Sequence, residues 1–203
     1  MNPYFRTPPA VKNLLIANML VFLAMSLLPV FHAFAERYFC LYWFGNGRFY
    51  PWQFITYMFL HADFRHLFFN MFTLWMFGRT FEYEVGTKRF LVYYFVCGVG
   101  AALMQLGVAW LTGEYGIVLL GASGAIYGLL LAFGIMHPNE RMLIFPLPVP
   151  VKAIWTVIGF GVIELLLGAT GLEQGVAHFA HIGGMFWGWL LLVYWKRKGK
   201  IYY

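Results

Sequence analysis

Charged residues are scarce in this chain. They make up 11% of its 203 residues, whereas 62% are hydrophobic and 21% aromatic. A water-soluble globule of this length cannot bury so much apolar surface, so the chain is expected to be solvated by lipid. A membrane-spanning helix needs about 20 residues, and the length therefore allows about six helices and no separate soluble catalytic domain. We expect one domain over residues 1–203.

Cysteine is also rare, with only Cys40 and Cys97. Two cysteines in these positions indicate neither a disulfide framework nor a metal knuckle. The net charge of +6 could suggest nucleic-acid binding, but the basic residues lie at the ends of apolar segments and in the tail 196–203. This placement is typical of membrane topology, and we expect no nucleic-acid partner.

Six charge-poor apolar runs predict an all-α bundle of six transmembrane helices. The runs are Leu14–Ala35, Phe64–Phe77, Phe90–Thr112, Ile117–Met136, Ala153–Ala169 and Val176–Trp195. The first run could be read as a signal peptide, because Ala33-Phe34-Ala35 has the form of a cleavage site. Its length of about 20 residues exceeds the roughly 7–15 of a signal peptide, so we expect the helix to be retained.

The fourteen Lys and Arg residues are distributed unevenly between the two sides of this bundle. Three lie on one side: Arg37, Arg48 and Arg65. The other eleven are Arg6, Lys12, Arg79, Lys88, Arg89, Arg141, Lys152, Lys196, Arg197, Lys198 and Lys200. The positive-inside rule then places both the N-terminal segment 1–12 and the basic tail in the cytoplasm. The second, fourth and sixth helices should begin at the outer face.

Polar residues on those three helices are expected at one level. Ser123 lies about six residues into the fourth run and His181 about five to seven into the sixth, roughly 8–10 Å below the outer helix ends. His66 and Asn70, spaced i and i+4, share one face of the second run. Ionisable side chains at such depth are costly and usually functional.

Small residues predict which helices touch. Gly124 and Gly128 have the spacing that lets two backbones approach in lipid, and so do Gly184 and Gly188. Packing of the sixth helix on the fourth would carry His181 toward Ser123. Tyr127, one turn below Ser123, could then stack on the imidazole, so that Tyr127→Phe should be nearly silent.

These residues permit serine protease chemistry. Neutral histidine can take the proton of a serine hydroxyl, and unpaired N–H groups at a helix start can bind an oxyanion together with His66 and Asn70. The candidate acids are Asp63, the only aspartate, and Glu164, and neither shares a helix face with His181. The sequence therefore favours a dyad.

Three segments together resemble the signatures of the rhomboid family of intramembrane serine proteases. They are Gly121-Ala122-Ser123-Gly124 with Tyr127, His66-x-x-x-Asn70, and His181-x-x-Gly184-x-x-x-Gly188. The resemblance implies that Ser123 is the nucleophile, that His181 is the general base and then acid, and that His66 and Asn70 bind the oxyanion. It also implies transmembrane protein substrates cut near the outer face, and no metal or nucleotide cofactor. The expected location is the bacterial inner membrane.

Two other functions remain open. A metal-dependent membrane hydrolase could use His66, His178 and His181 as zinc ligands, although no His-Glu-x-x-His motif is present. A catalytically silent relative could bind transmembrane helices without cutting them. Glu164 could line a water cavity with Gln174 and His178.

Overall fold

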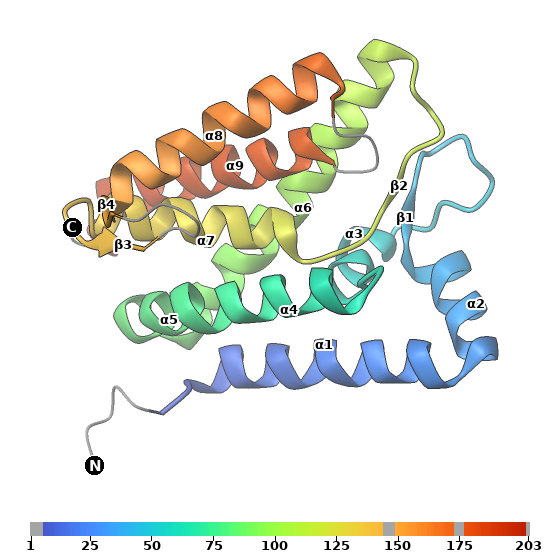
Figure 1. Cartoon of the computed structure of the whole chain (residues 1–203), viewed down its shortest axis with the longest axis horizontal. Coiled ribbons are helices and arrows are strands. Elements are labelled where there is room, and N and C mark those ends of the chain that lie inside the picture. Colours follow the sequence, from blue (N-terminus) through green and yellow to red (C-terminus); the bar gives the residue numbers. More distant parts are fainter. Residues whose placement is uncertain (1–5, 144–148, 173–176, 202–203) are drawn as a thin grey trace.

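The computed structural model describes residues 6–143, 149–172 and 177–201, and this part of the chain is mostly helical (Figure 1). The helical elements are α1 (Pro9–Leu27), α2 (Pro29–Phe39), α3 (Gln53–Thr56), η2 (Tyr57–Phe59), α4 (Phe64–Thr73), η3 (Leu74–Gly78), α5 (Arg79–Val85), α6 (Thr87–Thr112), α7 (Ser123–Met136), α8 (Ala153–Thr170) and α9 (His178–Arg197). The strands are β1 (Leu41–Tyr42), β2 (Val118–Leu119), β3 (Arg141–Met142) and β4 (Val151–Lys152). They form two short antiparallel pairs, β1 with β2 and β3 with β4.

Three of the described helices, α1, α6 and α8, are long and apolar enough to cross a membrane, and α7 is a shorter apolar helix. Helices α6 and α8 match two predicted spans closely. The side of α8 that faces away from the bundle exposes large apolar residues such as Trp155, Val162 and Leu166. A water-soluble surface would not carry this pattern, and the chain is therefore a multi-pass membrane protein.

Two predicted spans differ from the observed helices. The run Leu14–Ala35 is not one helix, because Leu28 is extended and Pro29 starts α2 in a new direction. The run Ile117–Met136 is helical only from Ser123, since its first residues form β2 and an extended connection. The start of the sixth run, Val176, lies outside the described residues.

The second predicted span is longer than Phe64–Phe77. Helix α4 continues through the π-helical turn η3 into α5, which ends at Val85. A π turn accommodates one more residue than an α turn, so it changes which faces the two halves present. The α4 half contacts α7, and the α5 half contacts α6 and also α7.

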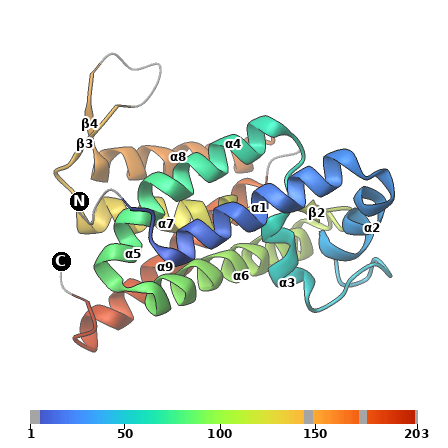
Figure 2. The same cartoon turned by 90° about the horizontal axis from the view of Figure 1, so that it is seen from below.

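The core of the bundle is formed by α6, α7 and α9, which pack most extensively on one another. Helix α8 covers α7 and α9 on one side, and α4 and α1 lie on the other side, so α7 is enclosed (Figures 1 and 2). Most residues of α7 are consequently buried, including Gly124, Ala125 and Gly128. A side chain at the start of α7 can therefore meet groups from both flanking layers.

A buried carboxylate joins three helices at one end of the bundle. Glu82 of α5 accepts hydrogen bonds from the backbone N–H groups of Ala10 (3.0 Å) and Val11 (2.8 Å) and from the hydroxyl of Thr87 (2.7 Å). The first turn of α1 has no intrahelical partners for its N–H groups, and its positive dipole end favours an anion. Glu82 thus holds the start of α1 against α5 and α6.

Candidate active site

Ser123 is the first residue of α7 and follows an extended segment that enters the bundle. The prediction that Ser123 lies six residues inside a helix is therefore wrong, because β2 pairs with β1 and Gly121 ends the extended path. Gly121 has φ +113°, a conformation that L side chains rarely adopt, and its N–H donates to the carbonyl of Tyr57 (2.9 Å). The extended segment from β2 to Gly121, rather than a helical turn, therefore carries the chain into the bundle as far as Ser123.

Gly121 is also required by the closeness of His66. A Cβ at Gly121 would lie 2.6 Å from Nε2 of His66 and 2.7 Å from its Cε1. No side chain fits there, and the backbone before Ser123 therefore runs directly beside the imidazole of His66 on α4.

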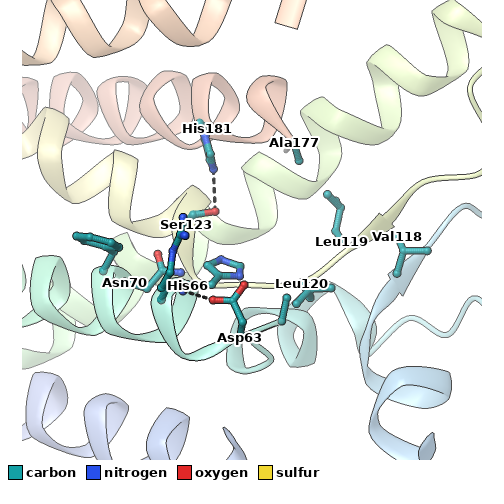
Figure 3. A pocket seen from close by; sticks show the side chains of 12 residues that line it. Asp63, His66, Asn70, Val118, Leu119, Leu120, Ser123, Ala177 and His181 are labelled. Carbon is teal, nitrogen blue, oxygen red and sulfur yellow. Dashed lines mark hydrogen bonds between the residues drawn. The ribbon is translucent and has the colours of Figure 1, made fainter. Parts of the chain in front are cut away.

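His181 contacts Ser123 directly. Its Nε2 lies 2.8 Å from Oγ of Ser123, which is hydrogen-bond distance (Figure 3). The contact follows from the close approach of α9 to α7, since a Cβ on Gly184 would lie 1.9 Å from the carbonyl oxygen of Gly124. A Cβ on Gly128 would lie 3.1 Å from the carbonyl oxygen of Gly184. These three glycines leave room for backbone against backbone.

Gly188 packs against α6, whereas the sequence suggested that it would pack against the fourth span, which contains α7. A Cβ there would meet the hydroxyl of Tyr93 at 2.4 Å and Sγ of Cys97 at 3.0 Å, and both residues belong to α6. The glycines of α9 therefore fit it against two helices, with Gly184 on α7 and Gly188 on α6.

Tyr127 stacks on the imidazole of His181. The ring centroids are 4.2 Å apart and the ring planes differ by 8°. Parallel stacking at this distance restricts the rotation of the imidazole. The hydroxyl of Tyr127 makes a second contact, donating a short hydrogen bond to Oε1 of Glu164. That bond was not anticipated from the sequence, and the expectation that Tyr127→Phe is nearly silent no longer follows.

His66 and Asn70 lie across Ser123 from His181 (Figure 3). Both belong to α4, whose first turn is capped by Asp63, which accepts from the N–H of His66 (2.9 Å). This hydrogen bond is the main cause that lowers the pKa of Asp63 below its usual value. Nδ2 of Asn70 is buried and has no hydrogen-bond partner among the described residues. It is a donor left available beside Ser123.

One cavity of about 470 Å³ is lined by all four candidate residues, which are His66, Asn70, Ser123 and His181. Its lining residues are Ala62, Asp63, Arg65, His66, Phe69, Asn70, Val118, Leu119, Leu120, Ser123, Ala177 and His181. The walls are largely apolar, and the polar groups converge around Ser123 (Figure 3). Such a cavity suits an extended peptide segment whose carbonyl is placed against a hydroxyl and a donor.

Ser123 and His181 do not form an isolated pair, because the carboxylate of Glu164 lies beside His181. Its Oε2 lies 3.0 Å from Nδ1 of His181 and 2.7 Å from Nδ1 of His178. The sequence favoured a dyad because neither candidate acid shares a helix face with His181, but the packing of α8 on α9 brings Glu164 beside it. Glu164 is buried between these side chains rather than exposed in a water cavity, and Gln174 lies outside the described residues.

The three histidines of the metal-dependent alternative do not form one cluster among the described residues. Within residues 6–143, 149–172 and 177–201, the groups gathered within 4.8 Å of one another are Glu164, His178 and His181. His66 lies instead on the far side of Ser123 (Figure 3). The ligand set proposed from the sequence is therefore replaced by one in which a carboxylate joins two histidines.

Comparison with known proteins adds independent information. A family model described as "Rhomboid domain" matches residues 48–198. The chain is 31% identical over 201 residues to "Rhomboid protein 1, mitochondrial" of Saccharomyces cerevisiae, covering 93% of this chain and 55% of that protein. It is 32% identical over 165 residues to "Rhomboid-like protein 11, chloroplastic" of Arabidopsis thaliana, covering 69% and 52%. The chain thus spans about half the length of these two relatives.

A bacterial relative is matched over a larger share of its own length. The "Putative rhomboid protease YdcA" of Bacillus subtilis is 31% identical over 149 residues, which cover 72% of this chain and 67% of that protein.

Proposed function

This chain belongs to the rhomboid family, and on that premise we propose that it is an intramembrane serine endopeptidase with Ser123 as nucleophile and His181 as general base. The observation that carries the proposal is the 2.8 Å contact between Oγ of Ser123 and Nε2 of His181 at the edge of a 470 Å³ cavity. A nucleophile needs a base within about 2.6–3.2 Å, and this pair meets that requirement.

The reaction proceeds in two halves. Nε2 of His181 takes the hydroxyl proton as Oγ of Ser123 attacks the scissile carbonyl carbon, and the carbonyl π electrons move to its oxygen. The C–N bond then breaks, and His181 gives its proton to the leaving amine. Water repeats the attack on the resulting ester with His181 again as base, which releases the acid and restores Ser123.

The negative charge on the carbonyl oxygen is stabilised by donors around Ser123. The first backbone N–H groups of α7 lack intrahelical partners and lie at its positive end. His66 and the unpaired Nδ2 of Asn70 supply side-chain donors on the α4 side. Donors held in place before the reaction stabilise the transition state without reorganisation. Gly121 and Gly124 support this arrangement, because larger residues would displace His66 or separate α7 from α6.

The proposed topology has six transmembrane segments, in which α1, α4 to α5, α6, α7, α8 and α9 each cross the bilayer. The start of α1, the end of α5, the strands β3 and β4 and the end of α9 lie at one end of the molecule (Figure 1). Most of the eleven basic residues lie in these segments or within a few residues of them in the sequence, which supports a cytoplasmic location for this end. The site lies toward the opposite end, and we propose the inner membrane of a bacterium as the location.

The proposed substrates are transmembrane proteins that reach the cavity from the lipid bilayer. The mostly apolar cavity wall suits a segment leaving a membrane helix, and the chemistry needs no metal or nucleotide and no nucleic-acid partner. A substrate helix must unwind locally, because a helical peptide bond is already hydrogen-bonded and shielded by side chains.

The decisive experiment uses purified protein in proteoliposomes with a single-span membrane protein as substrate. Wild type should cleave and should react with a serine-directed phosphonate, whereas Ser123→Ala and His181→Ala should do neither while remaining folded. The double variant should be hardly worse than either single one, because such groups act as a unit. Cleavage that persists in Ser123→Ala and stops with a chelator would replace this mechanism with a metal-dependent one. A wild-type protein that neither cleaves nor labels would favour the silent relative.

A further inference from the structure

An ionisable residue lies in the middle of the apolar helix α8. Glu164 is only 6% exposed, and a carboxylate buried in a membrane bundle is costly unless other groups pair with it. Its surroundings meet this requirement, because Tyr127 of α7 and His178 and His181 of α9 all face it. Four side chains from three helices thus form one buried polar cluster.

The contacts divide between the two carboxylate oxygens. Oε1 accepts the hydroxyl of Tyr127, and Oε2 faces Nδ1 of His178 at 2.7 Å and Nδ1 of His181 at 3.0 Å. An ionised carboxylate can accept from Tyr127 and His178, and its Oε2 also attracts a hydrogen on the nearby Nδ1 of His181. Tyr127 and His178 therefore hold Glu164 in place, and one side of Oε2 remains directed at His181.

The approach of Glu164 favours one tautomer of neutral His181. An ionised carboxylate cannot donate, so its approach to 3.0 Å favours the tautomer of His181 that carries hydrogen on Nδ1, and Nε2 is then the acceptor. Nε2 is the atom that lies 2.8 Å from Ser123, so the serine hydroxyl donates to it. The tautomer favoured by Glu164 is the one that a general base requires.

We propose that Glu164 is a positioning residue that extends the pair to a Ser123–His181–Glu164 relay. It keeps His181 in the Nδ1–H form and stabilises the positive charge that develops on the imidazole as Ser123 attacks. This inference rests on the proposed function, since the relay acts through His181. Throughout the step Glu164 stays ionised, and the Nδ1 hydrogen stays on His181.

The surroundings strengthen this electrostatic effect. Opposite charges interact more strongly in a buried site than in water. In the described part of the chain, Glu164 is the carboxylate that pairs with His181, whereas Asp63 is exposed at the start of α4. Nδ1 of His181 is not aligned for a straight hydrogen bond, and such contacts often tighten only when substrate is bound.

The first test measures the tautomer independently of proteolysis. Nitrogen-15 NMR of histidine-labelled protein should show His181 with hydrogen on Nδ1, the signal being assigned by its absence from His181→Gln. In Glu164→Gln the amide can either accept from Nδ1 or donate to it, so the Nδ1–H form should lose its dominance. An unchanged tautomer in Glu164→Gln, or hydrogen on Nε2 in wild type, would overturn the relay.

The second test measures cleavage kinetics. Glu164→Gln should lower kcat by about 10²- to 10⁴-fold with little change in KM, because Glu164 acts on the base and does not touch substrate. Glu164→Asp keeps the charge and should recover part of the loss. Thr156→Val is the matched control, since it removes a part-buried hydrogen bond on α8 to the carbonyl of Lys152, away from His181. A kcat for Glu164→Gln equal to that of Thr156→Val would overturn the relay.

The two tests separate this inference from the proposed function. A tautomer change in Glu164→Gln without any serine-dependent cleavage by wild type would support the control of the His181 tautomer by Glu164 and refute the protease. Cleavage that needs Ser123 but is unchanged in Glu164→Gln would support the protease and overturn the relay. Should Glu164→Gln fail to fold, Tyr127→Phe serves both readouts, because it removes one anchor of Glu164 but keeps the stacked ring. It should show a smaller loss of kcat and a mixed tautomer, and wild-type values in both readouts would overturn the relay.

Discussion

The contact between α7 and α9 can be tested by adding one methyl group at Gly184. In the structure a Cβ at this position would lie 1.9 Å from the carbonyl oxygen of Gly124 and 2.7 Å from its carbonyl carbon. Both obstacles are backbone atoms, so no side-chain rotation can relieve the clash. Gly184→Ala must therefore separate α9 from α7.

The size of the separation follows from the same distances. Real Cβ contacts essentially never fall below 3.0 Å, so relief of the 1.9 Å contact requires a shift of about 1.1 Å. If α9 moved as a rigid body along that direction, the Nε2–Oγ distance could rise from 2.8 Å to about 3.9 Å, beyond hydrogen-bond reach. A misplacement of about 1 Å at a catalytic group reduces rates by about 10²-fold. The overpacking should also destabilise the bundle by about 1–3 kcal/mol.

The assay compares cleavage rate and phosphonate labelling per folded molecule, with thermal unfolding in the same detergent. Gly159→Ala is the matched control, because this helical glycine of α8 has nothing within 4 Å of the added carbon. It should leave both quantities unchanged. If folded Gly184→Ala protein cleaved and labelled at the wild-type rate, the helix contact would not set the position of His181.

Two further predictions concern the oxyanion donors and the orientation. Asn70→Ala should lower kcat by about 10²–10³ at nearly unchanged KM, because the donor acts mainly in the transition state; a change in thermal stability alone would make Asn70 a packing residue. With both native cysteines replaced by Ser, a cysteine at Gly113 should react with impermeant reagents in intact cells and one at Asn2 should not. The reverse labelling pattern would place the site on the cytoplasmic side.

The sequence predicted the residues that gather around Ser123 because their spacing is local. His66 and Asn70 lie four residues apart on one helix, and Gly184 follows His181 by three residues, so helical geometry alone gives each face. The apolar runs were equally informative for α6 and α8, where helix bounds agree closely with the predicted spans. Family membership, predicted from the same segments, was confirmed by the match over residues 48–198.

The features that the sequence did not predict depend on contacts between distant segments. Ser123 starts α7 because β2 pairs with β1, some eighty residues earlier, and this pairing is invisible to hydropathy. Glu164 meets His181 through the packing of α8 on α9, which periodicity within one helix cannot predict. A signal was present, however, because a lone acid in an apolar helix usually has a functional partner.

The hydrogen bonds of Glu82 to the starts of α1 and α6 have a consequence for how the helices assemble during synthesis. The N–H groups of Ala10 and Val11 bind a carboxylate that is synthesised 72 and 71 residues later, respectively, and the same carboxylate accepts from Thr87 at the start of α6. Because α1 is synthesised before α5, the N–H groups of its first turn must hydrogen-bond to water or lipid headgroups until Glu82 is in place. The start of α1 is therefore fixed in place only after α5 has been made.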